Sequence, residues 1–141
     1  MVEGDDGSEC KLQLNIWDAA GDNNVRNLAH LFVNNVQCGV LVYAINSETS
    51  FQQLLDWHEH LRNNNENCLI ALVGNKSDLA DARTVSLEYG LQKQQELDCF
   101  MHIETSSYSD VESIQYLFKR IGQEIVKRRQ FAVQRGTVRL A

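Results

Sequence analysis

The side chains best suited to chemistry lie in a polar loop, Asn75-Lys76-Ser77-Asp78, which directly follows an apolar run and Gly74. An aspartate in such a loop can accept two hydrogen bonds, from a ring N–H and an exocyclic amine, which is the donor pattern of guanine. The alkyl stem of Lys76 can lie along a base plane, and the amide of Asn75 can tie neighbouring loops together. The alternative is a solvated loop in which Asp78 helps a turn, but the position straight after a buried strand favours a site for a purine base.

A second candidate is the segment at residues 17–21, which reads Trp-Asp-Ala-Ala-Gly. Asp18 stands at the predicted end of a strand, where a carboxylate can hold Mg²⁺ through a water molecule. Gly21, three residues later, lets a backbone N–H approach a terminal phosphate because it has no Cβ. The Asp-x-x-Gly pattern alone is also typical of an ordinary turn, so its value depends on the loop at residues 75–78 downstream.

Alternating strands and helices are predicted to position these loops. Apolar and polar residues alternate over 11–17, which predicts a half-buried strand, and a hairpin turn at 4–8 precedes it. Continuous apolar runs predict strands covered on both faces, and apolar residues at three- and four-residue steps predict amphipathic helices. The other predicted strands are residues 40–45, 68–73 and 99–103, and the predicted helices are a short one around 28–32 and longer ones at 51–61, 86–97 and 111–125.

This order of elements predicts an α/β fold in one domain, with an open, mainly parallel sheet and helices on both faces. Ligands of such sheets bind outside the carboxyl ends of the strands. Three polar loops leave strands at those ends, at residues 18–21, 75–78 and 105–108. We therefore expect the three loops to converge on a common cleft.

Length and composition restrict the class of protein. The 141 residues suffice for one hydrophobic core, and no apolar run approaches the ~20 residues that span a bilayer. The first ten residues are acidic and polar, unlike a secretory signal, so an intracellular, cytoplasmic protein is expected. The four cysteines, at positions 10, 38, 68 and 99, have no metal-binding spacing and are expected to be reduced thiols.

Charge is distributed unevenly along the chain. The net charge is −6, yet from Lys119 to the end there are seven basic residues and one acid. The acidic remainder excludes general nucleic-acid binding. The basic end could contact an anionic membrane or an acidic partner, or it could be a solvated helix end whose cations suit the negative end of the helix dipole.

Taken in order, these motifs resemble those of Rab and Ras-like small GTPases. Residues 17–21 resemble the family's Trp-Asp-Thr-Ala-Gly segment with Ala19 in place of threonine, residues 75–78 match its Asn-Lys-x-Asp motif, and residues 104–108 resemble its Glu-Thr-Ser-Ala-Lys loop. The resemblance runs from about residue 2 to residue 129. It implies a P-loop NTPase-like fold at residues 1–130, followed by a short, basic, flexible tail at 131–141.

The resemblance also implies a ligand, which is GTP or GDP with Mg²⁺. Asp18 would hold Mg²⁺ through water, and Gly21 would contact the terminal phosphate. The residues implied in base binding are Asn75, Lys76, Asp78, Ser106, Ser107 and Tyr108, the last three through the main chain, although Ser107 and Tyr108 replace the family's alanine and lysine.

The largest departure from the family is the absence of its first strand, its Gly-x-x-x-x-Gly-Lys-Ser/Thr loop, its first helix and its first switch. Without that loop we expect these 141 residues to bind nucleotide weakly or not at all, because the loop cradles the β-phosphate. Neighbours of the missing strand are expected to expose apolar surface. A shortened chain, an incomplete gene model and a degenerate GTPase remain alternatives.

Two smaller departures concern hydrolysis and membranes. Asp22 stands where the family's catalytic glutamine orients water, so it is predicted to be inactive at that position and any hydrolysis should be slow. No cysteine follows Cys99, so this chain offers no prenylation site, and membrane association is expected to be weak at most.

Two functions follow from the resemblance. One is a guanine-nucleotide switch of vesicle and membrane traffic, in which residues 18–31 recruit effector or scaffold proteins. The other is a pseudo-GTPase that does not hydrolyse nucleotide and acts as an interaction module. A flavodoxin-like or response-regulator domain shares the layering but leaves the loop at 75–78 unexplained.

Overall fold

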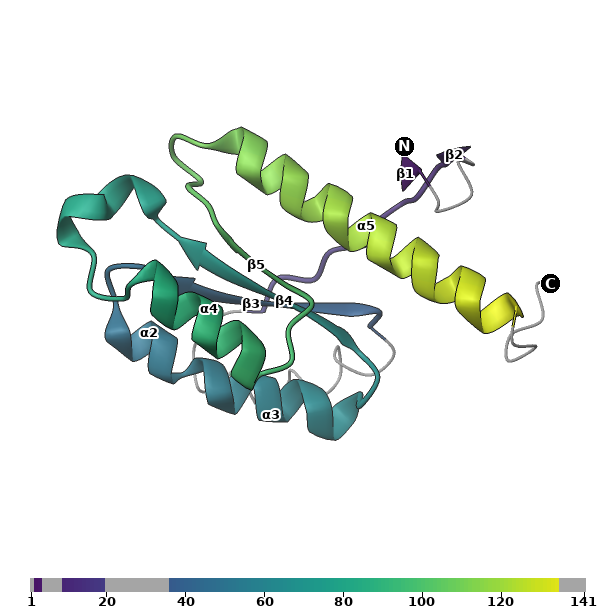
Figure 1. The fold of residues 1–141 in the computed structure, drawn as a ribbon, viewed down its shortest axis with the longest axis horizontal. Helices are drawn as coiled ribbons and strands as arrows, with labels where there is room; N and C mark the ends of the chain where they lie inside the picture. The colour runs from purple at the N-terminus through teal and green to yellow at the C-terminus, as the bar shows by residue number, and fades with distance from the viewer. Residues whose placement is uncertain (1, 4–8, 20–35, 135–141) are drawn as a thin grey trace.

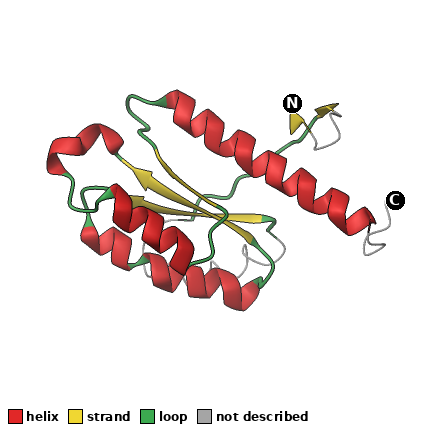
Figure 2. Ribbon diagram, in the orientation of Figure 1, coloured by secondary structure: helices red, strands yellow, loops and turns green. Residues whose placement is uncertain are grey.

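The computed structural model describes residues 2–3, 9–19 and 36–134 (Figure 1). These residues form two small sheets and several helices (Figure 2). In chain order the elements are β1 (Val2–Glu3), β2 (Glu9–Cys10), β3 (Cys38–Ala44), α2 (Glu48–Gln52), α3 (Leu54–Asn64), β4 (Leu69–Asn75), the 3-10 helix η1 (Ser77–Ala82), α4 (Leu87–Glu96), β5 (Met101–Glu104) and α5 (Val111–Gln134).

The main sheet is parallel, with the strand order β3-β4-β5. Its register places Ala44 opposite Asn75 and Gly74 opposite Glu104, so the carboxyl ends of all three strands lie at one edge. The loops that follow β4 and β5 are therefore neighbours. This arrangement confirms the predicted open parallel sheet.

Helices cover both faces of this sheet, as predicted (Figure 1). On one face α5 packs Leu117, Ile121 and Ile125 against alternate residues of the central strand β4. On the other face α2, α3 and α4 enclose a second core that contains the remaining apolar residues of β4, Ile70 and Leu72. Residues 69–74 are all buried, because the central strand has a helical layer on each side.

Helix starts follow from local side chains. Ser86 begins α4, where its hydroxyl accepts a hydrogen bond from the Tyr89 N–H at 3.2 Å, as the sequence predicted. The helix predicted at 51–61 is present but divided into α2 and α3 at Gln53. That residue keeps right-handed helical angles, so the interruption is local. None of the described helices is both long and apolar enough to cross a bilayer.

The strand predicted at residues 11–17 is wrong. The short hairpin β1-β2 precedes this segment as expected, but residues 11–19 have no strand structure. Leu12 and Leu14 are still half-buried, and Leu14 packs against the core under α5. The alternating pattern thus reports burial for Leu12 and Leu14, but Ile16 is 68% exposed. A strand also needs a hydrogen-bonded neighbour, and no described strand pairs with this segment.

The prediction that β3 is covered on both faces is wrong for one face. Leu41 and Tyr43 are buried beneath the α2–α4 layer, but Val40 and Val42, on the opposite face, are 38% and 54% exposed. This exposure agrees with the expectation that neighbours of a missing strand would show apolar surface. Among the described strands, β3 is paired on one side only.

Several predictions fall outside the described residues. The turn at 4–8, the short helix around 28–32, and the residues Gly21 and Asp22 belong to this group. The long helix predicted from residue 111 is confirmed as α5, which continues to Gln134. The division between a domain at 1–130 and a tail at 131–141 stays a prediction.

Candidate functional site

The loops that follow β4 and β5 are joined through their backbones at the carboxyl edge of the sheet. The Thr105 N–H donates to the Gly74 carbonyl at 2.9 Å, and the Ser77 N–H donates to the Thr105 carbonyl at 3.0 Å. These two bonds continue the parallel ladder beyond the end of β5. They bring the predicted loops at 75–78 and 105–108 together, as the sequence predicted for this pair.

Side chains make a second set of links between the same loops. The amide oxygen of Asn75 accepts from the Thr105 hydroxyl at 3.2 Å and from the Ser107 hydroxyl at 3.5 Å. The Ser106 hydroxyl donates to Oδ1 of Asp78 at 2.6 Å, a short bond of the kind that carboxylates form. Asn75 therefore ties the loops together, and Asp78 is fixed in orientation by its neighbour.

Ser106 is the centre of this network. Its residue is fully buried, and its oxygen accepts hydrogen bonds from the N–H groups of Tyr108 and Ser109 at 3.2 and 3.1 Å. The Asp110 N–H in turn donates to the Ser106 carbonyl at 3.0 Å, and the Asp110 carboxylate accepts from the N–H of Ser113 in the first turn of α5. The loop is thus held in one shape between β5 and α5.

The loop at 75–78 contains an unusual backbone conformation. Lys76 has φ 64° and ψ 36°, in the left-handed region, which costs a residue other than glycine about 1–2 kcal/mol. This turn redirects the chain from β4 into η1. Such strain persists where surrounding bonds fix the backbone, and it is frequent at ligand sites. The Lys76 and Tyr108 residues are both exposed, and Tyr108 is 90% exposed.

Asp78 and Ser107 retain hydrogen-bonding capacity. Asp78 is exposed, and its second oxygen has no hydrogen-bond partner among the described residues. The N–H of Ser107 likewise has no acceptor within the described part of the chain, although the N–H groups of its two successors are bonded to Ser106. One acceptor and one donor in adjacent loops are therefore unpaired among the described residues, and recognition of a base edge needs groups of both kinds.

An ion pair between Arg83 and Glu104, which the sequence analysis missed, lies next to these loops. Arg83 binds Glu104 through two hydrogen bonds of 2.7 and 2.8 Å, and it also donates to the Val85 carbonyl. The hydrogen bonds from Arg83 hold the pKa of Glu104 below its ordinary value, against the opposing effect of burial. The pair fastens the segment after η1 to the end of β5. The 21-residue separation left no local signal for it.

A buried polar pair and an unpaired amide lie near the same edge. The Tyr43 hydroxyl and Nε2 of His102 are 3.0 Å apart, and burial raises the pKa of Tyr43 to about 12 and lowers that of His102. The side-chain oxygen of Asn46, which follows β3, is buried without a hydrogen-bond partner among the described residues. An asparagine directly after the apolar run 40–45 could have drawn attention to this position.

The third predicted loop, at residues 18–21, is described only at residues 18 and 19, and no described contact joins these to the cluster. Asp18 is exposed, while Gly21 and Asp22 lie outside the described part of the chain. No group of three His, Cys, Asp or Glu side chains placed to hold a metal occurs among the described residues. The described loops at this edge thus present hydrogen-bonding groups from two of the three predicted loops.

Comparisons with known proteins agree with this geometry. The family model of the Ras family matches residues 3–127. The Ras-related protein RabQ of Dictyostelium discoideum is 31% identical over 129 residues, which cover 91% of this chain and 60% of RabQ. The chain thus spans 60% of the length of this relative. Because the family model covers most of the chain, including both loops of the cluster, the chain belongs to the Ras family of small GTPases.

Proposed function

We propose that the cluster at residues 75–78 and 105–108 recognises a guanine base, and that the protein acts as a Rab-type GTP/GDP switch in vesicle and membrane traffic. The observation that carries the proposal is the Ser106–Asp78 hydrogen bond, which orients the carboxylate outward from the sheet edge. The traffic role is supported by the similarity to a Rab-related protein. A cytoplasmic location, peripheral to endomembranes, goes with this role.

Base recognition follows from the unused groups of the cluster. The Asp78 carboxylate accepts hydrogen bonds from the ring N–H and the exocyclic amine of guanine, and the N–H of Ser107 donates to the guanine carbonyl. Adenine reverses the donor and acceptor on that edge, so both contacts would be lost. The stem of Lys76 covers a face of the base because its backbone turns outward from β4.

Affinity and hydrolysis depend on phosphate contacts that the described residues do not supply. In a nucleotide complex Asp18 would hold Mg²⁺ through water, and the Gly21 backbone would contact the terminal phosphate. Aspartate at position 22 is shorter than glutamine and is anionic, so it orients water poorly and repels the phosphate. We therefore propose weak, guanine-selective binding by these 141 residues and slow hydrolysis at most.

Nuclear magnetic resonance titration of the labelled chain with GMP and AMP tests base selectivity at weak affinity. GMP should shift the amide signals of Ser106, Ser107 and Asp78 with a dissociation constant on the order of 1 mM, and AMP should leave them in place. Equal shifts with both nucleotides, or no shifts with either, would overturn the base site. Sub-micromolar binding of GTP in isothermal titration would contradict the predicted weakness.

A second candidate function is a pseudo-GTPase that acts as an interaction module through residues 18–31 or an exposed strand. The exposed Val40 and Val42 on β3 favour it, because they place apolar side chains next to unpaired strand backbone among the described residues. A module of this kind should fold stably only in the presence of a partner. A cooperative unfolding transition of the isolated chain would count against it.

A further inference from the structure

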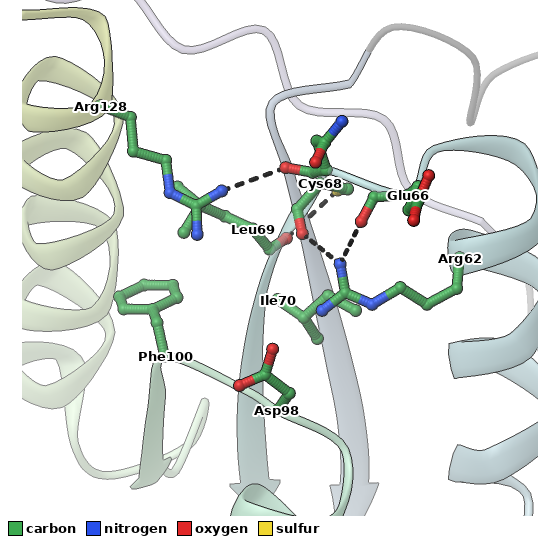
Figure 3. Close-up of a pocket in the computed structure, with 9 residues that line it drawn as sticks. Arg62, Glu66, Cys68, Leu69, Ile70, Asp98, Phe100 and Arg128 are labelled. Atoms are coloured by element: carbon green, nitrogen blue, oxygen red, sulfur yellow. Dashed lines mark hydrogen bonds between the residues drawn. The ribbon is translucent and has the colours of Figure 1, made fainter. Parts of the chain in front are cut away.

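The amino edge of the sheet holds a second charged site, on the opposite side from the base cluster. A pocket of about 230 Å³ opens beside the start of β4, with Arg62, Arg128, Asp98, Phe100 and Cys68 in its lining (Figure 3). Arg62 comes from α3 and Arg128 from α5, which lie on opposite faces of the sheet. Helices from both layers thus contribute one guanidinium each.

Both arginines are fixed by the turn that precedes β4. Nη1 of Arg62 donates to the carbonyls of Glu66 and Cys68 at 2.9 and 2.8 Å, and Nη1 of Arg128 donates to the Asn67 carbonyl at 3.1 Å (Figure 3). A side chain that is already anchored loses less conformational entropy when it binds a ligand. Arg62, with two bonds, is therefore preorganised, whereas Arg128 is held by one exposed bond.

The remaining guanidinium donors are unused. Each guanidinium has five N–H groups, and among the described residues Nε and Nη2 of Arg62 and Arg128 have no acceptor. Neither arginine belongs to an ion pair within the described part of the chain, whereas Arg83 pairs with Glu104 and Lys93 pairs with Glu96. The two positive charges in the pocket are therefore without a paired anion there.

Among the charged side chains that line the pocket, Arg62 and Arg128 favour an anion, and Asp98 and Glu66 oppose it. Burial raises the pKa of the Cys68 thiol, and the charges of Arg62 and Arg128 oppose that rise, so their field reaches the floor of the pocket. Lys127 and Arg129 flank Arg128 on α5. The Asp98 carboxylate lies at the lower side of the pocket (Figure 3). Glu66 also lines the pocket.

We propose that this pocket binds a phosphate group between Arg62 and Arg128, supplied either by a soluble phosphate compound or by a phosphorylated lipid headgroup. A planar guanidinium matches two oxygens of a phosphate, and this pocket has one guanidinium from each helical layer in its lining. The site is independent of the base cluster, because it lies at the other edge of the sheet and shares no residue with it.

Isothermal titration of the whole chain with pyrophosphate tests the site, with matched variants. Arg128→Gln should weaken binding about tenfold, because one bidentate contact is lost. Arg120→Gln removes the same charge from α5 outside the pocket, where Arg120 bonds to Gln123, and should change binding less than about twofold. Equal weakening by both variants would mean diffuse charge attraction and would overturn the pocket, as would no binding by the unaltered chain.

Asp98 supplies an independent test with the opposite sign. It is a left-handed residue with φ 50°, a conformation that asparagine also tolerates, so Asp98→Asn should fold normally. Removing its negative charge should tighten pyrophosphate binding about threefold at low salt. Unchanged or weaker binding by this variant would contradict the proposed position of the phosphate.

Sedimentation with vesicles separates the two sources of phosphate. Vesicles of phosphatidylcholine with a minority of phosphatidylinositol phosphate should retain the chain, and Arg128→Gln should release it, if a lipid headgroup is the ligand. Pyrophosphate binding without retention on these vesicles would assign the site to soluble phosphates. Retention that Arg120→Gln reduces as much as Arg128→Gln would again overturn the pocket.

Discussion

The carboxyl and amino edges of the same sheet use opposite chemistry. At the carboxyl edge, hydroxyls and carboxylates of Ser106, Asp78 and Asp110 satisfy one another and the N–H groups of the loops. At the amino edge, Arg62 and Arg128 donate to backbone carbonyls. The difference follows from the direction of the chain, because strands lead into helix N-termini at one edge and receive helix C-termini at the other.

This difference separates the tasks of the two edges. N–H groups at helix starts attract acceptors such as Asp110 and Ser86, so the carboxyl edge collects hydroxyls and carboxylates. Carbonyls of the turn between α3 and β4 accept from the guanidinium groups of Arg62 and Arg128 at the amino edge. A parallel sheet thereby places a hydrogen-bonding site and a cationic site at its opposite ends.

The largest expected loss of stability comes from removing the Ser106 hydroxyl at the carboxyl edge. Ser106→Ala removes the hydroxyl that donates to Asp78 and accepts from two N–H groups in a fully buried position. We expect a loss of about 3 kcal/mol in the free energy of unfolding, measured by urea denaturation. Ser109→Ala removes an exposed hydroxyl that makes one bond to the Ser106 oxygen, at 3.1 Å, and should cost less than about 1 kcal/mol. Similar losses in both variants would contradict the central role of Ser106.

The next effect concerns the ion pair beneath the cluster. Glu104→Gln should lower the free energy of unfolding by about 2 kcal/mol, because Arg83 loses a bidentate carboxylate partner. Lys93→Gln breaks the pair with Glu96 on the surface of α4, where Glu96 is 54% exposed, and should cost about 0.3 kcal/mol. Urea denaturation of both variants checks this order of effects. Equal losses of stability would contradict it.

The same pair predicts a pH dependence with a definite sign. Because the pKa of Glu104 is lower in the folded state than its ordinary value of 4.5, its contribution is complete above that pH and is lost as the pH falls through the folded-state pKa. The stability difference between the unaltered chain and Glu104→Gln should therefore shrink below about pH 4.5. Burial lowers the pKa of His102 and the charge of Glu104 opposes this, so His102 weakens stability already below pH 6.5, and more so in Glu104→Gln.

The sequence predicted more of the fold than of the contacts that hold the site. The apolar run at 68–73 indicated the central strand, and its position before Asn75 indicated a binding loop. The strand at 11–17 was wrong because alternation reports burial and says nothing about a pairing neighbour. The partners Ser106 and Asp78 are 28 residues apart, so only the register of β4 with β5 could bring them together.

A single substitution at Asp78 should exchange the base specificity that we propose for the carboxyl edge. Asp78→Asn replaces one of the two carboxylate oxygens with an amide N–H donor. The amide oxygen can still accept from the ring N–H of xanthine, and the amide N–H can donate to the adjacent xanthine carbonyl. The ratio of XMP to GMP affinity should rise by at least about tenfold, or about 1.4 kcal/mol, in the resonance titration. Loss of both ligands without a gain for XMP would mean that Asp78 holds the loop and does not read the base.

The smallest expected effects test whether the amino edge is structural or ligand-binding. Arg62→Gln should lower the free energy of unfolding by about 1 kcal/mol, because the carbonyls of Glu66 and Cys68 lose their donor. Cys68 is a buried residue. Arg128→Gln should change it by less than about 0.5 kcal/mol, since Arg128 and Asn67 are exposed and water can replace the bond. If Arg128 were present only to fasten the turn, its loss would cost stability and leave phosphate binding unchanged. The opposite pattern, unchanged stability with weakened phosphate binding, identifies Arg128 as a ligand-binding residue and separates its task from that of Arg62.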